Sequence, residues 1–317
     1  MVYGTSGRLL STGSRSAQAF SQNASDVQGD VEDFDDFSRV LGSGDFNGDG
    51  YADLAIGVPG EDLDREGVLQ RDAGLVHVIY GSASGVSPSR EQADQAWSQG
   101  SGEIEGDNEQ MDLFGSALAT GDFNQDGFAD LAIGVPGEDL SNGQLRRNAG
   151  AVNVIYGSSS GLSATQTRSD QIWSQNAQDI GGDIETGDSF GACLESGDFN
   201  GDGYVDLAIG VPGEDLSRDG VLQRDAGLVQ VIYGSATGLS ATNTRSSQDW
   251  SQNATDIGGD TETSDRFGTT LSSGDFNGDG LVDLAIGVPG EDLSRDGVLR
   301  RDAGLVQVIY GLSLIHI

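Results

Sequence analysis

The stretch Asp45-Phe46-Asn47-Gly48-Asp49-Gly50-Tyr51-Ala52-Asp53 organises this chain, because its pattern occurs four times. The other copies span residues 122–130, 198–206 and 275–283. In every copy the first, third, fifth and ninth residues are Asp, Asn, Asp and Asp, and the sixth is Gly. Such a pattern places side-chain oxygens at alternate positions around a residue that permits a sharp turn.

Oxygen ligands in this order suit a hard cation such as calcium. The seventh residue varies among Tyr, Phe and Leu, which fits a ligand supplied by the backbone carbonyl. The sequence therefore predicts one Ca²⁺ per repeat, four in total, with these ligands: Asp45, Asn47, Asp49, Tyr51, Asp53, Asp122, Asn124, Asp126, Phe128, Asp130, Asp198, Asn200, Asp202, Tyr204, Asp206, Asp275, Asn277, Asp279, Leu281 and Asp283.

The loop differs from an EF-hand. The twelfth residue counted from Asp45 is Ile56, where an EF-hand carries a bidentate Glu. Residues 52–58 read as a short buried strand rather than a helix. The alternative is a set of solvated Asp/Asn/Gly turns, but a turn needs one or two such residues and not four at fixed spacing.

The period of the repeat predicts the fold. The loops start at residues 45, 122, 198 and 275, and a period of this length is typical of propeller blades or an array. The unit around residue 122 contains four expected strands, 114–120, 129–135, 150–156 and 171–175, and a hairpin at 138–149. Four strands per repeat are the content of a blade. The fold class is therefore all-β, with repeat units at about 1–35 (partial), 36–112, 113–188, 189–265 and 266–311 (partial).

Large aromatic residues mark the fourth expected strand. They are expected to pack on the outside of each blade, and they are Trp97, Trp173 and Trp250, with Phe20 in the first unit. Cys193 is the only cysteine, so the chain has no internal disulfide, and the residue is interpreted as a small buried strand residue.

The charge balance excludes several functions. The chain has 16 Lys and Arg residues against 51 Asp and Glu residues, a net charge of −35. Nucleic acid and anionic membrane surfaces are disfavoured partners, since both require a basic face. No run of about 18 apolar residues predicts a membrane span. Four calcium ions would change the net charge from −35 to −27, so they account for only part of the acidity.

Both ends suggest a fragment. The first residues match the middle of a repeat, and Leu312-Ser-Leu-Ile-His-Ile317 breaks the pattern abruptly. These six residues resemble a translated sequencing adaptor, so 312–317 is interpreted as a non-native tail.

An enzyme is not expected. Outside the tail the only histidine is His77, which aligns with Asn153, Gln230 and Gln307 and is expected at a polar, outward strand position. The pair Glu61–Asp62 recurs in every unit, which favours a structural role. We expect four arginines to pair with these carboxylates across the hairpins: Arg71, Arg147, Arg224 and Arg301.

A second acidic pattern precedes each Phe-Gly. It consists of Asp30 and Glu32, Asp107 and Glu109, Asp183 and Glu185, and Asp260 and Glu262. It either holds a second, weaker cation or forms a polar loop between blades, and the loop is the preferred interpretation.

These motifs together resemble the FG-GAP repeat of integrin alpha chains and many bacterial surface proteins. The Phe-Gly is present at 114–115, 190–191 and 267–268, while the first unit has Phe37-Ser38. Gly-Val-Pro replaces Gly-Ala-Pro at 57–59, 134–136, 210–212 and 287–289. The resemblance covers 1–311 and implies a β-propeller, usually seven-bladed, with calcium loops on its lower face and the hairpins on its upper face.

The resemblance and the loops together predict a calcium-stapled extracellular module, secreted or on the cell surface, for protein interaction or cell adhesion. Its partner would be a protein or glycan bound on the upper face. The alternative is an accessory propeller of a larger secreted enzyme.

Overall fold

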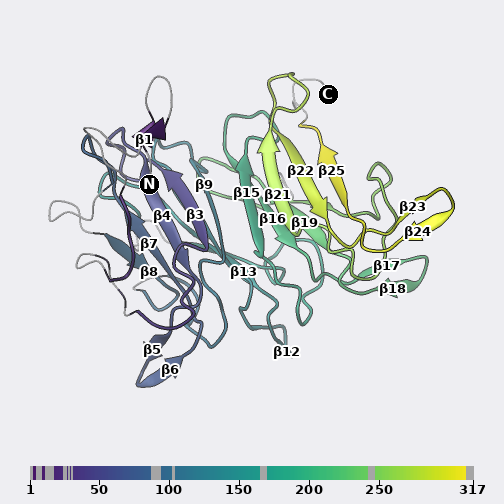
Figure 1. Cartoon of the computed structure of the whole chain (residues 1–317), viewed down its shortest axis with the longest axis horizontal. Helices are drawn as coiled ribbons and strands as arrows, with labels where there is room; N and C mark the ends of the chain where they lie inside the picture. The colour runs from purple at the N-terminus through teal and green to yellow at the C-terminus, as the bar shows by residue number, and fades with distance from the viewer. Residues whose placement is uncertain are drawn as a thin grey trace.

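The computed structural model describes residues 3–4, 9–10, 18–23, 27, 29, 31–86, 94–101, 104–164, 170–241 and 247–311. All regular elements within these ranges are β-strands, which confirms the all-β prediction. Figure 1 shows that the main sheets follow one another in sequence order across the molecule, from β3 and β4 to β22 and β25.

Three repeats form four-stranded antiparallel sheets whose strands lie in chain order. The first sheet contains β3 (Val40–Gly44), β4 (Asp53–Val58), β7 (Leu75–Ile79) and β8 (Gln95–Trp97). The second contains β9 (Ala117–Gly121), β10 (Asp130–Val135), β13 (Ala151–Ile155) and β14 (Gln171–Trp173). The third contains β15 (Cys193–Gly197), β16 (Asp206–Val211), β19 (Leu228–Ile232) and β20 (Gln248–Trp250). In the described part of the fourth repeat, β21 (Thr270–Gly274), β22 (Asp283–Val288) and β25 (Leu305–Ile309) form a three-stranded sheet.

A small hairpin connects the second and third strands of each sheet, as the sequence predicts. The hairpins are β5 (Leu63–Arg65) with β6 (Val68–Gln70), β11 (Leu140–Ser141) with β12 (Leu145–Arg146), β17 (Leu216–Arg218) with β18 (Val221–Gln223), and β23 (Leu293–Arg295) with β24 (Val298–Arg300). A further pair joins β1 (Tyr3–Gly4) to β2 (Leu9–Leu10). At the tip of β5–β6 both Glu66 and Gly67 have positive φ, as a tight hairpin turn requires.

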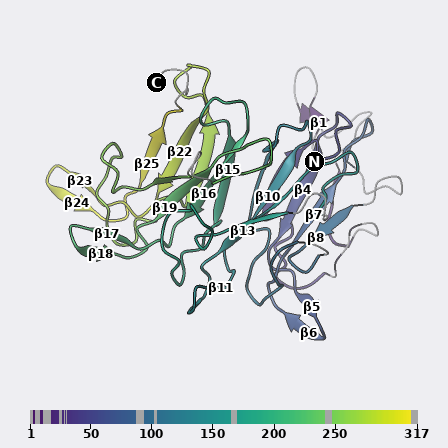
Figure 2. The ribbon, with the colours of Figure 1, turned by 180° about the vertical axis from the view of Figure 1, so that it is seen from behind.

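The sheets are arranged as blades of a β-propeller. The first strands β3, β9, β15 and β21 contact one another in that order, so they form the inner edge of successive blades. Hydroxyl groups link these strands: Thr120 Oγ1 donates to Ser43 O at 2.8 Å, and Ser196 Oγ donates to Thr120 O at 2.8 Å. Figure 2 shows the same succession from behind.

The hydrophobic core lies between neighbouring blades. Each second strand has the sequence Asp-Leu-Ala-Ile-Gly-Val, and β10 is buried along its whole length. Val76 and Val78 of the first blade pack with Leu131 and Ile133 of the second. A near-continuous apolar strand therefore fits a sheet that is covered on both faces.

The Phe-Gly segment of one repeat packs on the previous blade. Isolated parallel bridges join Gly74 to Phe114, Gly150 to Phe190 and Gly227 to Phe267, and all three phenylalanines are fully buried. A Cβ at Gly57 would lie only 2.2 Å from the carbonyl oxygen of Gly115. The glycines of the Phe-Gly and Gly-Val-Pro motifs are therefore required, because the backbones of neighbouring blades approach closely at these positions.

Several further predictions have an outcome. Trp97, Trp173 and Trp250 lie on the fourth strands and pack half-buried against the core clusters, as expected. Phe20 packs against Val27, Ile56, Ile79 and Val86.

Cys193 begins β15 and is half-buried. The tail at 312–317 lies outside the described residues. Within the described ranges no helix is long and apolar enough to cross a membrane.

The expectation for His77 is wrong. Its side chain is fully buried on β7, as are those of Asn153 and Gln230 at the matching positions. The position is polar but faces polar groups inside the protein: Asn153 Nδ2 donates to Asp170 Oδ2 at 3.4 Å, just before β14, and to Glu105 O at 2.9 Å in the segment after β8. Burial lowers the pKa of His77, and the charge of Asp94, whose Oδ2 lies 3.6 Å from Nδ1, opposes that effect.

Candidate metal loops

The four Asp-rich loops connect the first and second strands of each blade, at the opposite end from the hairpins because the strands alternate in direction. In the first blade the loop joins β3 to β4. The sixth residue of every loop has a left-handed φ: 86° at Gly50, 93° at Gly127, 92° at Gly203 and 88° at Gly280. A Gly at this position is therefore required by the backbone conformation.

Side-chain oxygens of the loop accept hydrogen bonds from its own backbone. Asp45 accepts from Asp49 N at 3.1 Å through Oδ1 and from Gly50 N at 2.8 Å through Oδ2. Asn47 Oδ1 accepts from Asp49 N at 2.9 Å, and Asp49 Oδ1 accepts from Tyr51 N at 2.9 Å. The same bonds occur in the other three loops. Because Asp45 Oδ1 and Asn47 Oδ1 both accept from Asp49 N, these two oxygens lie on the same side of the turn.

The ninth residue of the loop is the most buried. Asp53 is 1% exposed, and Asp130, Asp206 and Asp283 are fully buried. Asp130 Oδ2 accepts from Phe123 N at 2.9 Å, and its Oδ1 accepts from Gly157 N at 2.9 Å, just after β13. One carboxylate thus ties the loop to the end of the third strand. The matching glycines 81, 157, 234 and 311 recur in all repeats, a signal that sequence reasoning missed.

Burial and neighbouring negative charges raise the pKa of three of these aspartates. Burial is the main cause that raises the pKa of Asp130 to about 8, and the charges of Asp126 and Asp122 add to the effect. The same causes raise the pKa of Asp206 to about 7 and that of Asp53 to about 6. A cation at the loop would offset this repulsion.

The donor set of each loop fits a hard divalent cation. An ionised carboxylate has about four lone-pair sites, so a bond from one or two N–H groups leaves acceptor capacity for a metal. Each loop offers oxygen atoms only: those of three Asp side chains, one Asn side chain and the backbone carbonyl of the seventh residue. Oxygen-only sites suit calcium.

The structure arranges the hairpin ends differently from the sequence-based expectation. Asp62 Oδ1 accepts a hydrogen bond from Asp72 N at 2.9 Å and closes the base of β5–β6, and the matching aspartates do the same in the other repeats. Among the described ion pairs, Arg65 binds Asp107 at 2.7 Å and Arg218 binds Asp260 at 2.8 Å. The pairs described do not include Arg71, Arg147, Arg224 or Arg301.

A second group of carboxylates lies at the hairpin end of each blade. Within the described ranges, one set of three places its ligand atoms within 4.8 Å of one another, and it consists of Glu32, Asp35 and Glu61. Asp30 of the predicted pattern lies outside the described residues. Sequence reasoning missed Asp35 and its equivalents Asp112, Asp188 and Asp265, although each stands two residues before the repeat's Phe.

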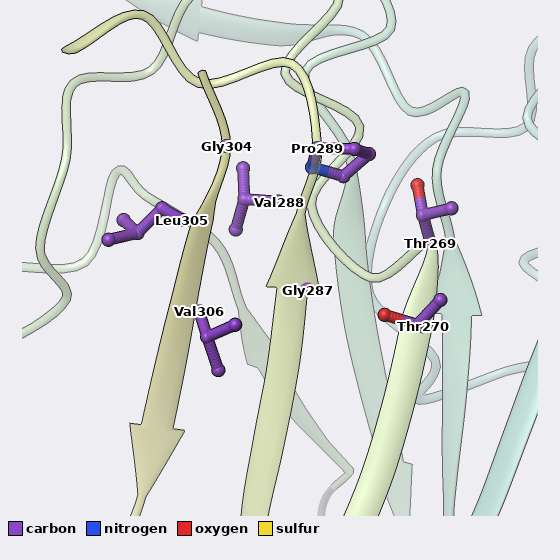
Figure 3. Close-up of a pocket in the computed structure, with 8 residues that line it drawn as sticks. All are labelled: Thr269, Thr270, Gly287, Val288, Pro289, Gly304, Leu305 and Val306. Atoms are coloured by element: carbon purple, nitrogen blue, oxygen red, sulfur yellow. The ribbon is translucent and has the colours of Figure 1, made fainter. Parts of the chain in front are cut away.

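The hollow in Figure 3 is a packing surface rather than a candidate ligand site. It is lined by Gly287, Gly304, Val306 and their neighbours on β22, β25 and β21. In the other repeats, the residues that match Gly287 lie against the Phe-Gly carbonyl of the next repeat. Val306 is 66% exposed, whereas the matching Val76 is fully buried beneath that segment.

The comparison with family models agrees with this architecture. The model described as FG-GAP repeat matches residues 37–79, 114–155, 190–232 and 267–309. These four matches cover more than half of the chain, and each contains the first three strands of a blade with its metal loop. The chain belongs to the FG-GAP repeat family.

Curated proteins with similar sequences fall into two kinds. Phosphatidylinositol-glycan-specific phospholipase D of Rattus norvegicus is 36% identical over 195 residues, covering 61% of this chain and 20% of the relative. Integrin alpha-5 of Xenopus laevis is 33% identical over 184 residues, covering 57% of this chain and 15% of the relative. Integrin alpha pat-2 of Caenorhabditis briggsae is 26% identical over 266 residues, covering 80% and 18%. The chain spans about a fifth of the length of these relatives or less.

Proposed function

We propose that the chain is a calcium-stapled propeller segment that acts as an extracellular module for interaction or adhesion. The observation that carries the proposal is the fourfold loop, in which the same oxygen-bearing residues adopt the same hydrogen bonds around a left-handed Gly. Calcium would offset two of the three aspartate charges of each loop and fix the turn between the first and second strands. Extracellular modules of this kind bind calcium with dissociation constants of about 10⁻⁴–10⁻³ M.

The hairpin end supplies the interaction surface. Large apolar side chains recur there with more than two-fifths of their surface exposed, and they are Val68, Leu69, Leu145, Val221, Leu222, Val298 and Leu299. An apolar group repeated at the tip of each blade, on a chain of strongly negative charge, favours a protein or glycan partner over an acidic polymer. This end is the upper face that the sequence comparison with the family predicts.

The chain itself is proposed to lack a catalytic centre. His77 is buried within a blade, and the Glu-Asp pairs repeat in four structurally equivalent places. The similarity to a phospholipase D nevertheless favours one alternative, an accessory propeller of a larger secreted enzyme. Sequencing the complete reading frame distinguishes the two: a separate domain with its own nucleophile and base would favour the accessory role.

Calcium titration of one altered loop tests the proposal. Asp126→Asn keeps the side-chain oxygen that accepts from Phe128 N at 3.0 Å but removes one charge from the second loop. We expect calorimetry to show one site fewer, or one site at least tenfold weaker, than in the wild type. Asp225→Asn is the control, because Asn148 naturally occupies the same position in the second repeat. Equal calcium binding by Asp126→Asn and the wild type would contradict the proposal.

Binding to a partner is tested separately. Val221→Ser with Leu222→Ser removes the apolar tip of β17–β18 without touching a loop. Beads coated with the wild-type chain should retain components of a glycan and extracellular-protein array in calcium, and beads coated with the double variant should retain less. Retention that neither this variant nor chelator changes would argue against an interaction surface at the hairpin end.

A further inference from the structure

Four side chains from three segments converge at the hairpin end of the third blade. Glu185 and Asp188 lie in the loop that enters the blade, and Glu214 follows β16. Gln175 comes from the previous blade, two residues after β14. Asp188 Oδ2 accepts from Glu185 N at 2.5 Å, and Gln175 Nε2 donates to Glu214 Oε2 at 2.5 Å. We call these four residues the inter-blade cluster.

Oxygen atoms in the inter-blade cluster are buried without a hydrogen-bond donor. They are Asp188 Oδ1, Glu185 Oε2 and Gln175 Oε1. Asp188 is fully buried, and Glu214 is 4% exposed. A buried polar atom that lacks a partner costs about 1–3 kcal/mol, and more when it is charged. Three acceptors of this kind on facing segments can be satisfied by a shared cation, by added protons or by an ordered water.

The surrounding charges do not supply that positive charge in every repeat. Burial, with the charges of Glu185 and Asp215, raises the pKa of Asp188 to about 7, and Arg146 acts in the opposite direction. However, the position of Arg146 is occupied by Gln70 beside the cluster of the second repeat and by Gln223 beside that of the fourth. Arg65 and Arg218 lie near these two clusters instead, but the ion pairs described for them are with Asp107 and Asp260 and not with the carboxylates of the clusters.

The cluster is built four times. The aspartate Oδ1 is buried and lacks a donor at Asp35, Asp112 and Asp265 as well, and the glutamine Oε1 does so at Gln99 and Gln252. In the first repeat the ligand atoms of Glu32, Asp35 and Glu61 lie within 4.8 Å of one another. Two oxygens bound to one calcium at 2.3–2.6 Å each are at most about 5 Å apart, so the spacing in the first repeat fits a shared ion. Among the described residues the equivalent sets of the other repeats do not meet this spacing, and an ion would have to draw their carboxylates together.

A glycine keeps space beside the cluster. Gly182 has φ of 87°, and a Cβ there would lie 2.4 Å from Gln175 Nε2 and 3.2 Å from both oxygens of Glu214. Gly259 stands in the same relation to Gln252 and Glu291. An open polar cavity of about 520 Å³ borders the equivalent cluster of the second repeat through Glu109 and Asp139, and it offers an entry path from solvent.

We propose that the inter-blade cluster is a second calcium site, present once in each repeat and separate from the Asp-rich loops. In the third repeat its ligands are Glu185, Asp188 and Glu214, with the amide oxygen of Gln175 turned toward the ion. The loop sites join two strands of one blade, whereas this site joins the last strand of one blade to the entry loop and second strand of the next. It corresponds to the second cation that the sequence leaves open as the alternative to a polar loop between blades.

The number of calcium ions bound per chain tests this site. Asp188→Asn keeps the acceptor for Glu185 N and removes the charge. Equilibrium dialysis of the chelator-stripped full chain against calcium should show more than four ions on the wild type and one ion fewer on Asp188→Asn. The control Asp225→Asn, which alters an exposed residue at the base of the neighbouring hairpin, should bind as many ions as the wild type.

Two further variants make the result unambiguous. Asp202→Asn alters the third loop, and a double variant with Asp188→Asn should lose two ions. If the loops bind no calcium, Asp202→Asn changes nothing while Asp188→Asn still loses one ion, so the two proposals fail separately. If Asp188→Asn does not fold in chelator, Glu214→Gln takes its place. Calcium binding by the folded variant equal to that of the wild type would overturn the second site.

Discussion

At the scale of single residues, glycine does two different things in this chain. Gly127 and Gly191 share a left-handed φ, 93° and 87°, but a Cβ at Gly127 would meet no atom within 4 Å. A Cβ at Gly191 would lie 2.6 Å from the carbonyl oxygen of Ala151 in the previous blade. The first glycine is needed for its backbone conformation alone, and the second also for close packing between blades.

These two glycines give a matched prediction. Gly127→Ala should lower the free energy of unfolding by about 1–2 kcal/mol, the cost of a non-glycine residue in the left-handed region. Gly191→Ala should cost clearly more, because the carbonyl of Ala151 must also move. Urea denaturation in chelator, which removes any metal effect, measures both. Equal costs would mean that the carbonyl of Ala151 moves away from the added Cβ with little loss of free energy.

His77 provides a prediction about pH. Burial lowers its pKa below the ordinary 6.5, so below about pH 6.5 the unfolded chain binds a proton that the folded chain does not. The wild type should therefore lose stability relative to His77→Asn as pH falls from 7.5 to about 5, by up to roughly 1.4 kcal/mol per pH unit. Asn is the natural residue at position 153, where it is equally buried. A stability difference that does not change with pH would contradict this account of His77.

At the scale of elements, the joint between blades depends on one phenylalanine per repeat. Phe190 is fully buried and bridges to Gly150, whereas Phe37 in the first unit is half-buried and is followed by Ser38 instead of Gly. Ser38 has φ of 72°, so this non-glycine residue occupies the left-handed region that Gly115, Gly191 and Gly268 occupy elsewhere.

The two phenylalanines should respond differently to truncation. Phe190→Ala should cost about 3–5 kcal/mol of unfolding free energy, as expected for a fully buried aromatic residue. Phe37→Ala should cost less than half as much, since its ring already contacts solvent. Denaturation of both variants under the same conditions provides the comparison. A cost for Phe37→Ala that equals that of Phe190→Ala would show that the motif, rather than its burial, determines stability.

Repetition explains which elements the sequence could predict. Four copies of a 76- or 77-residue unit reveal the strands, the hairpins and the loops, because each pattern can be checked against three others. Single positions were harder. The polarity of His77 predicts an exposed side chain, but the side chain is buried and its Nδ1 lies 3.6 Å from Asp94 Oδ2, just before the neighbouring strand β8. The arginines of the hairpins were assigned by charge alone, whereas backbone N–H groups satisfy the matching aspartates.

The inter-blade cluster shows the same limit at a candidate site. Its acidic pattern is visible in the sequence, but the four side chains come from segments up to about 40 residues apart: Gln175 bonds Glu214 across 39 positions. No spacing pattern within a short stretch of sequence predicts that these side chains meet. Only the antiparallel path of the blade brings the end of one fourth strand to the end of the next second strand.

At the scale of the whole molecule, a net charge of −35 opposes the compact state through self-repulsion. Under the proposal, each bound calcium ion would offset two negative charges at a loop whose ninth aspartate is buried. Stability should therefore rise with calcium concentration through binding to the folded state. Neighbouring blades stabilise one another, because the hydrophobic core lies between blades and not within single sheets.

Thermal unfolding of the chain in calcium and in excess chelator is the most direct test. At calcium concentrations about tenfold above the dissociation constant, each site should add roughly 1.4 kcal/mol, and four loops should raise Tm by roughly 10 °C or more. Magnesium at the same concentration serves as the control for ionic strength and should raise Tm much less, because Mg²⁺ demands near-octahedral geometry and gives up its waters reluctantly. A Tm that is the same in calcium and chelator would contradict the account and leave the Asp-rich loops as solvated turns.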